Sequence, residues 1–329
     1  MHVLITGASG YIGRAVTHRL LDDGHAVTAM VRRHDPVLPA AAGQWLVPDI
    51  GALPADSTQR LQAVQVVIHC AARVHVLRET LAAPLDAFRK VNVDATLALA
   101  ELAAAAGVRR FVFLSTIGVH GSDSHAGAFR HDDTPRPQSP YALSKLEAEQ
   151  ALDALAGRSA MQTIHVRPPL VYGRDAPGNF ALLRRAVASG LPLPLGALHH
   201  ARSFVSLENL VDLLAHLVVW PGHASGAYLV SDGKDLSTAD FIRAIAHAMG
   251  KRTLLLPVPM PALSALAALL GRSDQIRKMA VPLTLDTAHI RSTLAWSPRW
   301  TVQESLERAL SATQASTDGP GSDADQSRA

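Results

Sequence analysis

The chain has little cysteine, little excess charge and no long uncharged apolar segment. One cysteine among 329 residues excludes a disulfide within the chain, and a reducing cytoplasm is the expected location. The formal net charge is +3 without a dense run of Lys or Arg, which argues against a nucleic-acid partner. No apolar run is long enough for a membrane span, and Met1 leads directly into a strand-like segment, so we expect no signal peptide.

Several catalytic motifs are missing as well. Gly250-Lys251 lacks the upstream glycine and the following hydroxyl residue of a phosphate-binding P-loop, and no serine has the context of a nucleophile elbow. The chain contains 16 histidines, but those in the loop from His120 to Asp133 lack the spacing of a zinc or iron site, so no metal is expected. Cys70 lies in an apolar run and is interpreted as a buried strand residue rather than a nucleophile.

In the first half of the chain, apolar runs alternate with helical patterns. Such alternation is typical of a parallel sheet covered on both faces, so we predict an α/β fold with a Rossmann-type doubly wound sheet. The predicted strands are Val3–Thr6, Ala26–Val31, Val64–Cys70, Arg110–Ser115 and Thr163–Arg167, and the clearest helices are Ile12–Asp22, Leu85–Ala106 and Pro140–Ala156.

The pattern becomes less regular after Gly173. We expect a dinucleotide-binding domain over 1–173, a smaller and interleaved substrate lobe over 174–311, and a disordered polar tail over 312–329. The Ala/Leu-rich segment Pro259–Gly271 is interpreted as a buried helix, with a membrane-surface helix as the alternative. The other predicted elements are helices at Asn179–Ser189, Glu208–Val219 and Ser237–Met249, and strands at Ala227–Val230 and Leu254–Val258.

A glycine-rich turn joins the first predicted strand to the first helix. Glycines without Cβ atoms permit a tight turn and a close approach to a pyrophosphate, and the helix presents its N–H groups and positive dipole end to that anion. The strand before and the helix after favour a dinucleotide site over a merely structural turn. The residues expected to contact the cofactor here are Gly7, Ser9, Gly10, Tyr11, Ile12 and Gly13.

The end of the second predicted strand indicates which dinucleotide is preferred. An acidic residue at this place binds the ribose 2′-hydroxyl, whereas arginine accepts a 2′-phosphate. Arg32 and Arg33 occupy the region and no acidic residue stands in the expected place, which favours NADP(H), with NAD(H) as the alternative. The arginines could equally be solvated surface residues. Asp49, followed by Ile50, is a candidate adenine contact or a plain turn residue.

Tyr141 and Lys145 are the candidate redox pair. Their spacing of four places both side chains on one face of a helix that Pro140 can start and Ser139 can cap. A nearby ammonium stabilises phenolate and lowers the tyrosine pKa, which suits acid–base work on a hydroxyl or ketone; the alternative is an exposed helix pair. Ser115 and Thr116 end a strand at the crevice edge, where a hydroxyl can hold the reacting oxygen.

In this order, the turn, Ser115-Thr116 and Tyr141/Lys145 resemble the extended short-chain dehydrogenase/reductase family, in its epimerase/dehydratase branch. The resemblance covers nearly the whole chain and implies Thr116 as the catalytic hydroxyl, a nicotinamide-ribose contact for Lys145 and a homodimer. It further implies cofactor contacts at Ala71, Ala72, Arg73, Asn92, Ser115, Tyr141 and Pro168, and nucleotide-diphosphate contacts at Asn179 and Arg202, the latter with a surface arginine as the alternative.

Departures from the family pattern narrow the expected reaction. The family's dehydratases have Asp and Glu directly after the catalytic threonine, whereas Ile117 and Gly118 stand here and cannot exchange protons. The second half resembles bacterial UDP-N-acetylhexosamine 4-reductases and 4-epimerases of O-antigen assembly. We therefore predict NADPH-dependent reduction of a UDP-4-keto-6-deoxyhexosamine. The alternatives are a UDP-hexose or UDP-N-acetylhexosamine 4-epimerase and, in another class, an NADP-sensing binding protein without turnover.

Overall fold

A parallel sheet organises the larger part of the molecule. The computed structural model describes residues 1–74, 84–269 and 273–311. Within these residues seven strands pair in parallel in the order β10-β6-β5-β4-β1-β2-β3. Their bounds are β1 (His2–Thr6), β2 (Ala26–Val31), β3 (Gly43–Leu46), β4 (Val66–His69), β5 (Arg110–Leu114), β6 (Gln162–Arg167) and β10 (Gly226–Leu229).

The direction of strand addition reverses between β1 and β4. From β1 the chain adds β2 and β3 on one side, and then returns to place β4, β5 and β6 on the other. In open α/β sheets the ligand crevice lies at this reversal, at the carboxyl ends of the strands. The glycine turn after β1 and the loop after β4 therefore meet at the expected binding edge.

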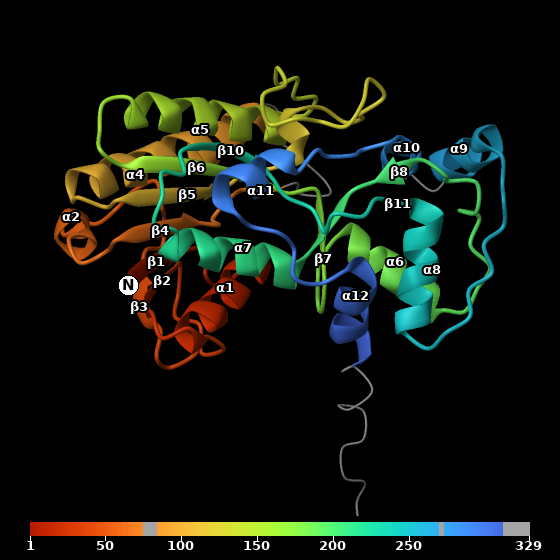
Figure 1. The fold of residues 1–329 in the computed structure, drawn as a ribbon, viewed down its shortest axis with the longest axis horizontal. Helices are drawn as coiled ribbons and strands as arrows, with labels where there is room; N and C mark the ends of the chain where they lie inside the picture. Colours follow the sequence, from red (N-terminus) through yellow and green to blue (C-terminus); the bar gives the residue numbers. More distant parts are fainter. Residues whose placement is uncertain (75–83, 270–272, 312–329) are drawn as a thin grey trace, which may run out of the picture.

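Helices cover both faces of the sheet (Figure 1). One face carries α1 (Tyr11–Asp22) and α7 (Leu207–Val219), most of whose leucines and valines are buried against the strands. The other carries α2 (Ser57–Leu61), α4 (Ala95–Ala105) and α5 (Pro140–Ala156), which close a second apolar layer. Before α4 the chain forms α3 (Pro84–Arg89) and the π-helical turn η1 (Lys90–Asp94), and α11 (Ala288–Leu294) lies beside β10.

A smaller lobe extends from the sheet at the right of Figure 1. Its core is aromatic: the rings of Phe204 and Phe241 stack 4.0 Å apart, and Tyr172 packs edge-on against Phe241. The lobe contains the strand pairs β7 (Leu170–Tyr172) with β9 (Phe204–Ser206) and β8 (Ala201–Arg202) with β11 (Leu236–Ser237), and the helices α6 (Asn179–Ala188), α8 (Thr238–Ala248), α9 (Met260–Leu269), α10 (Ser273–Met279) and α12 (Val302–Leu310). No helix in the described ranges is long and apolar enough to cross a membrane.

The predicted strands and helices of the first half are confirmed to within a few residues, but four expectations are wrong. Leu254–Val258 forms only an isolated bridge from Leu255 to Leu193. The predicted helix Leu85–Ala106 is interrupted by η1. β4 ends before the half-buried Cys70, whose burial raises the thiol pKa to about 12. Finally, α9 is largely exposed rather than buried. The predicted disordered tail, 312–329, lies outside the described residues.

Candidate active site

The glycine turn has no room for side chains at two of its positions. Gly7 has φ +64°, and a Cβ there would lie 2.7 Å from the backbone nitrogen of Ala71. A Cβ on Gly13 would overlap the carbonyl oxygen of Gly7. Backbone packing between the first turn of α1, the end of β1 and the loop after β4 therefore requires glycine at both positions.

The amino end of α1 is open to a ligand. Gly10 is its N-cap with extended backbone, and no side chain of the described residues caps the first turn, where Tyr11 and Ile12 stand. Uncapped N–H groups at the positive end of a helix dipole form an anion site. The geometry fits a dinucleotide pyrophosphate, which would rest on the first turn of α1.

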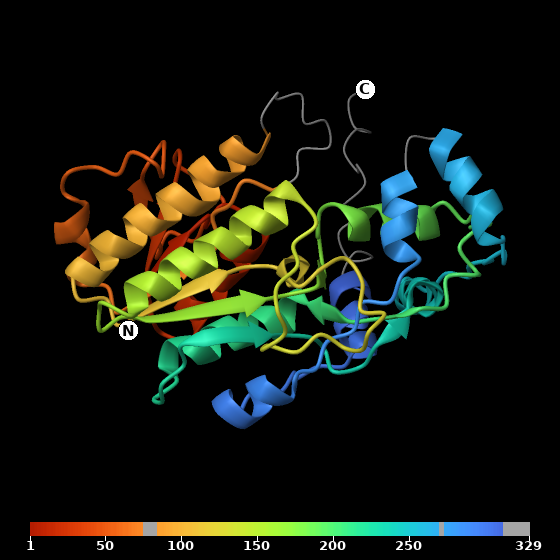
Figure 2. The same ribbon diagram turned by 90° about the horizontal axis from the view of Figure 1, so that it is seen from above.

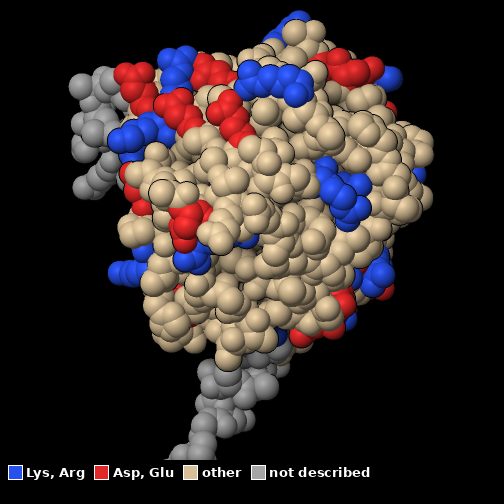
Figure 3. Space-filling model, turned by 90° about the vertical axis from the view of Figure 1, so that its left-hand side faces the viewer, with Lys and Arg blue, Asp and Glu red and all other residues tan. Residues whose placement is uncertain are grey.

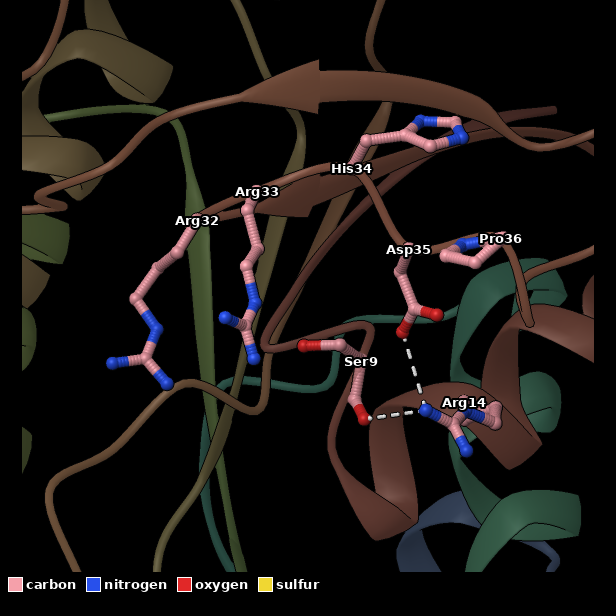
Figure 4. Close-up of a pocket in the computed structure, with 7 residues that line it drawn as sticks. All are labelled: Ser9, Arg14, Arg32, Arg33, His34, Asp35 and Pro36. Carbon is pink, nitrogen blue, oxygen red and sulfur yellow. Dashed lines mark hydrogen bonds and ion pairs between the residues drawn. The ribbon is translucent and has the colours of Figure 1, made fainter.

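A cavity of about 730 Å³ opens beside this turn at the end of β2 (Figure 4). Its lining includes Ser9 and the exposed Arg32 and Arg33. Two further lining residues, Arg14 and Asp35, were missed by the sequence reasoning. They form an ion pair at 3.2 Å, and Arg14 also donates to the Ser9 carbonyl at 3.1 Å. An acidic group therefore does stand in this cavity, but its charge is paired with Arg14.

Asn92 ties the loop after β4 to α5, the helix that contains Tyr141 and Lys145. Its amide accepts from the Arg73 N–H at 2.8 Å and donates to the Arg73 carbonyl at 3.1 Å. The same side chain donates to Ser144 Oγ at 3.0 Å. Asn92 is fully buried within η1, and an isolated π-helical turn inside a helix often marks a functional site. The same loop is tied to the end of β1, because the Ala71 N–H donates to Thr6 Oγ1.

The end of β5 presents the two predicted hydroxyls. Thr116 Oγ1 accepts from the Gly118 N–H at 3.1 Å and caps the 3₁₀ turn η2 (Ile117–Val119). Ser115 Oγ is buried without a hydrogen-bond partner among the described residues. The buried Pro168 accepts from Ile117 N–H at 2.9 Å and so holds the segment after β6 against η2. A buried hydroxyl lacking a partner at a strand end is a reasonable place for a ligand atom.

Helix α5 brings Tyr141 and Lys145 to the same edge. Ser139 caps it by accepting from Ala142 N–H at 3.1 Å, and Pro140 takes the first turn, as predicted. A Cβ on Gly118 would lie 3.4 Å from both Thr116 Oγ1 and the Ala142 Cβ. The first turn of α5, which contains Tyr141, therefore packs directly against the threonine turn.

The electrostatics of the pair differ from the expectation. Lys145 is 1% exposed; its Nζ donates to the Leu114 carbonyl at 2.8 Å and lies 4.2 Å from the Phe113 ring centre. Burial lowers the Lys145 pKa to about 8 and raises the Tyr141 pKa to about 12. The predicted lowering of the Tyr141 pKa is therefore wrong for the protein without a ligand. The Lys145 ammonium is bound to the Leu114 carbonyl, and the effect of burial on the phenol is larger than any effect of that charge.

Behind the pair lies a buried charge network that the sequence reasoning missed. Arg167 of β6 binds Glu149 of α5 through Nε at 3.1 Å and through a second N–H at 2.5 Å. Its third contact is His120 Nε2 at 2.7 Å. Burial and the neighbouring guanidinium lower the His120 pKa to about 4, so the imidazole is neutral and accepts from Arg167. Glu149 follows Lys145 by one helical turn, so helix spacing could have indicated that Glu149 lies on the same face of α5 as Lys145.

The structure places the remaining predicted residues as follows. Asp49 is exposed and closes a turn by accepting from Gly51 N–H, and Ile50 packs on the apolar layer beneath α4. Asn179 is the exposed first residue of α6. The Arg202 guanidinium donates to the carbonyls of Lys278 and Val281 at 2.6 Å each, and burial lowers its pKa to about 10.

The histidine-rich loop separates its side chains. His120 stacks on Phe129, whereas His131 stacks on His289 with ring centres 3.6 Å apart. In the described part of the chain no group of three or more His, Cys, Asp or Glu side chains could hold a metal ion.

The fold and this edge of the sheet define a dinucleotide-binding protein of the oxidoreductase class, with a glycine turn, a strand-end hydroxyl and a Tyr-Lys helix. The model of the NAD dependent epimerase/dehydratase family matches residues 3–230. A UDP-glucose 4-epimerase of Vibrio cholerae is 39% identical over 317 residues, which cover 94% of each chain. The protein therefore belongs to the epimerase/dehydratase family of extended short-chain dehydrogenases/reductases, which are NAD-dependent enzymes.

Solved structures support the same fold. UDP-N-acetylglucosamine 4-epimerase from Bacillus cereus superposes with a TM-score of 0.77 at 17% identity, covering 95% of this chain and 99% of the other. MoeE5 in complex with UDP-glucose and NAD gives a TM-score of 0.76 at 26% identity, covering 97% and 100%.

Proposed function

We propose that the protein is an NAD-dependent 4-epimerase of a UDP-hexose. The observation that carries the proposal is the packing of the Thr116 turn, after β5, against the first turn of α5, the helix that contains Tyr141. The similarity to the Vibrio cholerae UDP-glucose 4-epimerase supports the substrate class, and the NAD in the MoeE5 complex supports the cofactor.

In this reaction Thr116, Tyr141 and Lys145 each have a distinct role. The nicotinamide, when bound, supplies a reversible hydride acceptor for C4 of the sugar. Tyr141 takes the proton of the C4 hydroxyl as the C4–H bond breaks, and returns it after the sugar has turned its other face. Thr116 orients the C4 oxygen. Once the Lys145 ammonium leaves the Leu114 carbonyl, its positive charge stabilises the Tyr141 phenolate. No water is added or lost, and the cofactor is regenerated.

The residues after Thr116 argue against dehydration of the sugar. Ile117 is 5% exposed and packs in an apolar cluster, and Gly118 carries no side chain. Removing water from the sugar needs an additional acid and base, which these positions do not supply. The proposed reaction is therefore confined to C4 oxidation and reduction.

NADPH-dependent reduction of a UDP-4-keto sugar is the second candidate. The observation in its favour is the cavity in which Arg32 and Arg33 offer guanidinium groups suited to a 2′-phosphate, while Asp35 is paired with Arg14. Under this reading the hydride is consumed and the Tyr141 proton stays on the product. Asn179 and Arg202 would hold the nucleotide diphosphate in either reaction.

One experiment separates the two candidates. The purified protein is incubated with UDP-glucose or UDP-N-acetylglucosamine without reductant, and the product is separated from its C4 epimer by chromatography. In parallel it is mixed with NADPH and a UDP-4-keto-6-deoxy sugar while nicotinamide absorbance is followed. Conversion to the C4 epimer without net nicotinamide change supports the epimerase. Stoichiometric loss of NADPH without epimer formation would overturn the epimerase assignment in favour of the reductase.

A further inference from the structure

Helix α9 is apolar on the side that faces solvent. The segment Met260–Leu269 contains no charged residue. Among the side chains of α9 whose burial the structure describes, Leu263 and Ala267, one turn apart, are buried, whereas Leu269 is 86% exposed. The remaining exposed positions, Pro261, Ala262, Ser264, Ala265 and Ala268, are apolar or small. An all-apolar helix is normally buried, so an exposed one indicates a missing partner.

The segment that leads into α9 extends this apolar surface. Leu255 faces inward and bridges Leu193, while its neighbours Leu254 and Leu256 turn outward and are 60% and 41% exposed. Leu191, two residues before the bridge, is 66% exposed. Figures 1 and 2 both place α9 and this segment at the end of the small lobe farthest from the sheet. Together they form one projecting apolar tip.

The tip has cations around it and almost no anions. Residues 176–207 and 241–273, which include the tip and the segment bridged to it, contain no Asp or Glu. Exposed Lys251 and Arg252 precede the outward leucines, and Arg185 lies on α6. Helix α10, which packs on α9, contains Asp274 in its first turn and Arg277 and Lys278 in its last turn. The opposite end of the molecule differs, since Figure 3 shows acidic and basic side chains interspersed there.

We propose that this tip docks the protein peripherally on an anionic phospholipid bilayer. An apolar face inserts at the boundary between headgroups and acyl chains, and a cationic rim is attracted to the negative headgroups. The chain's own tail, 312–329, is polar and contains no apolar run that could cover α9. A protein partner would have to match the cationic rim with acids of its own, which a second copy of the tip does not offer.

Vesicle cosedimentation tests the proposal with the full chain. The protein is mixed with phosphatidylcholine vesicles that contain, or lack, phosphatidylglycerol, at low and high salt. Binding is expected on the phosphatidylglycerol vesicles and is expected to weaken with salt. Leu269→Glu should lower the vesicle partition coefficient about tenfold, because it exchanges an inserted apolar group for a charge. Arg252→Glu should reduce binding chiefly at low salt.

The matched control is Val219→Glu, which changes an exposed apolar residue at the end of α7, outside the tip. It should bind vesicles like the wild type, and all variants should keep turnover in solution and their unfolding temperature. Failure of the wild type to sediment with phosphatidylglycerol vesicles, or equal loss in Val219→Glu and Leu269→Glu, would overturn the proposal. A dimer in sedimentation velocity that Leu269→Glu dissociates, without vesicle binding, would instead make the tip an interface between copies.

Discussion

The glycine turn Gly7–Gly13 and the first turn of α1 form a phosphate cradle at the same edge of the sheet as the Tyr141–Lys145 pair. The two regions differ in how far the fold alone prepares them for the reaction. The cradle is built from backbone: Gly7 and Gly13 are in close contact with neighbouring backbone, and no side chain of the described residues caps the start of α1. The pair consists of ionisable groups in which burial favours the uncharged forms, since it lowers the Lys145 pKa and raises the Tyr141 pKa, and Lys145 donates to the Leu114 carbonyl. Backbone binding geometry forms with the fold, whereas side-chain charge states depend on what fills the site.

Removing the Tyr141 hydroxyl should have the largest effect. Tyr141→Phe is expected to lower kcat about a thousandfold, because the proton of the C4 hydroxyl loses its acceptor. Bound dinucleotide should remain, measured by release and chromatography, since the cradle does not use this phenol. Tyr228→Phe, in the buried strand β10, is the control and should retain activity. Unchanged function in Tyr141→Phe would favour a dinucleotide sensor over an enzyme.

Adding one methyl group to the cradle should have the second-largest effect. Gly13→Ala is expected to weaken dinucleotide affinity about a hundredfold, because its Cβ overlaps the Gly7 carbonyl and forces the turn away from the pyrophosphate. Calorimetric titration measures the affinity and thermal unfolding checks the fold. Gly157→Ala, where the Cβ would meet only ordinary contacts at 3.7 Å, should bind normally. Tight binding by Gly13→Ala would show that the cradle is not the pyrophosphate site.

The cavity at the end of β2 should control the choice between dinucleotides. The double change Arg32→Ser and Arg33→Ser is expected to reduce the affinity for NADPH relative to NADH about tenfold or more, because the 2′-phosphate loses its charge-assisted contacts. Arg109→Ser, an exposed arginine outside the cavity, is the control. An unchanged ratio would mean that these arginines are solvated surface residues, and would remove the main support for the reductase.

The smallest effect concerns stability. Lys145→Met should raise the unfolding temperature by a few degrees near neutral pH while abolishing turnover, because a buried ammonium is replaced by an apolar side chain of similar length. The Lys145 pKa is lowered in the folded state, from 10.5 to about 8, so the unfolded state binds more protons between these values. The wild type should therefore gain stability relative to Lys145→Met as pH rises through that window, and a constant difference would contradict this account.

Periodicity and turn chemistry predicted the sheet well because the buried strands are continuous apolar runs. β3 was missed, since Gly43–Leu46 is short and contains one buried residue, Trp45. That β10 joins the large sheet next to β6 is set by tertiary pairing, which local pattern does not contain. The exposure of α9 has the same cause: its composition predicts burial, and only the neighbouring elements decide whether a partner is present.

The site was predictable where motifs are contiguous and not where charges meet across the fold. The glycine turn, Thr116 and the Tyr141 helix were identified from adjacent residues in the sequence. The Arg14–Asp35 pair and the Glu149–Arg167–His120 network join different segments of the chain. Helix spacing places Glu149 on the face of Lys145, but the partners of these charges are known only from the structure. The expected homodimer and the cytoplasmic location remain predictions.

The most direct test of the central claim is a spectrophotometric titration of the Tyr141 phenol with and without NAD, with Tyr141→Phe as the reference. Burial places its pKa near 12 in the protein alone, above the usual value of 10.0. If the dinucleotide draws Lys145 away from Leu114 and toward the phenol, the difference spectrum will show phenolate below pH 10 only when NAD is bound. Identical titration curves with and without NAD would contradict the account.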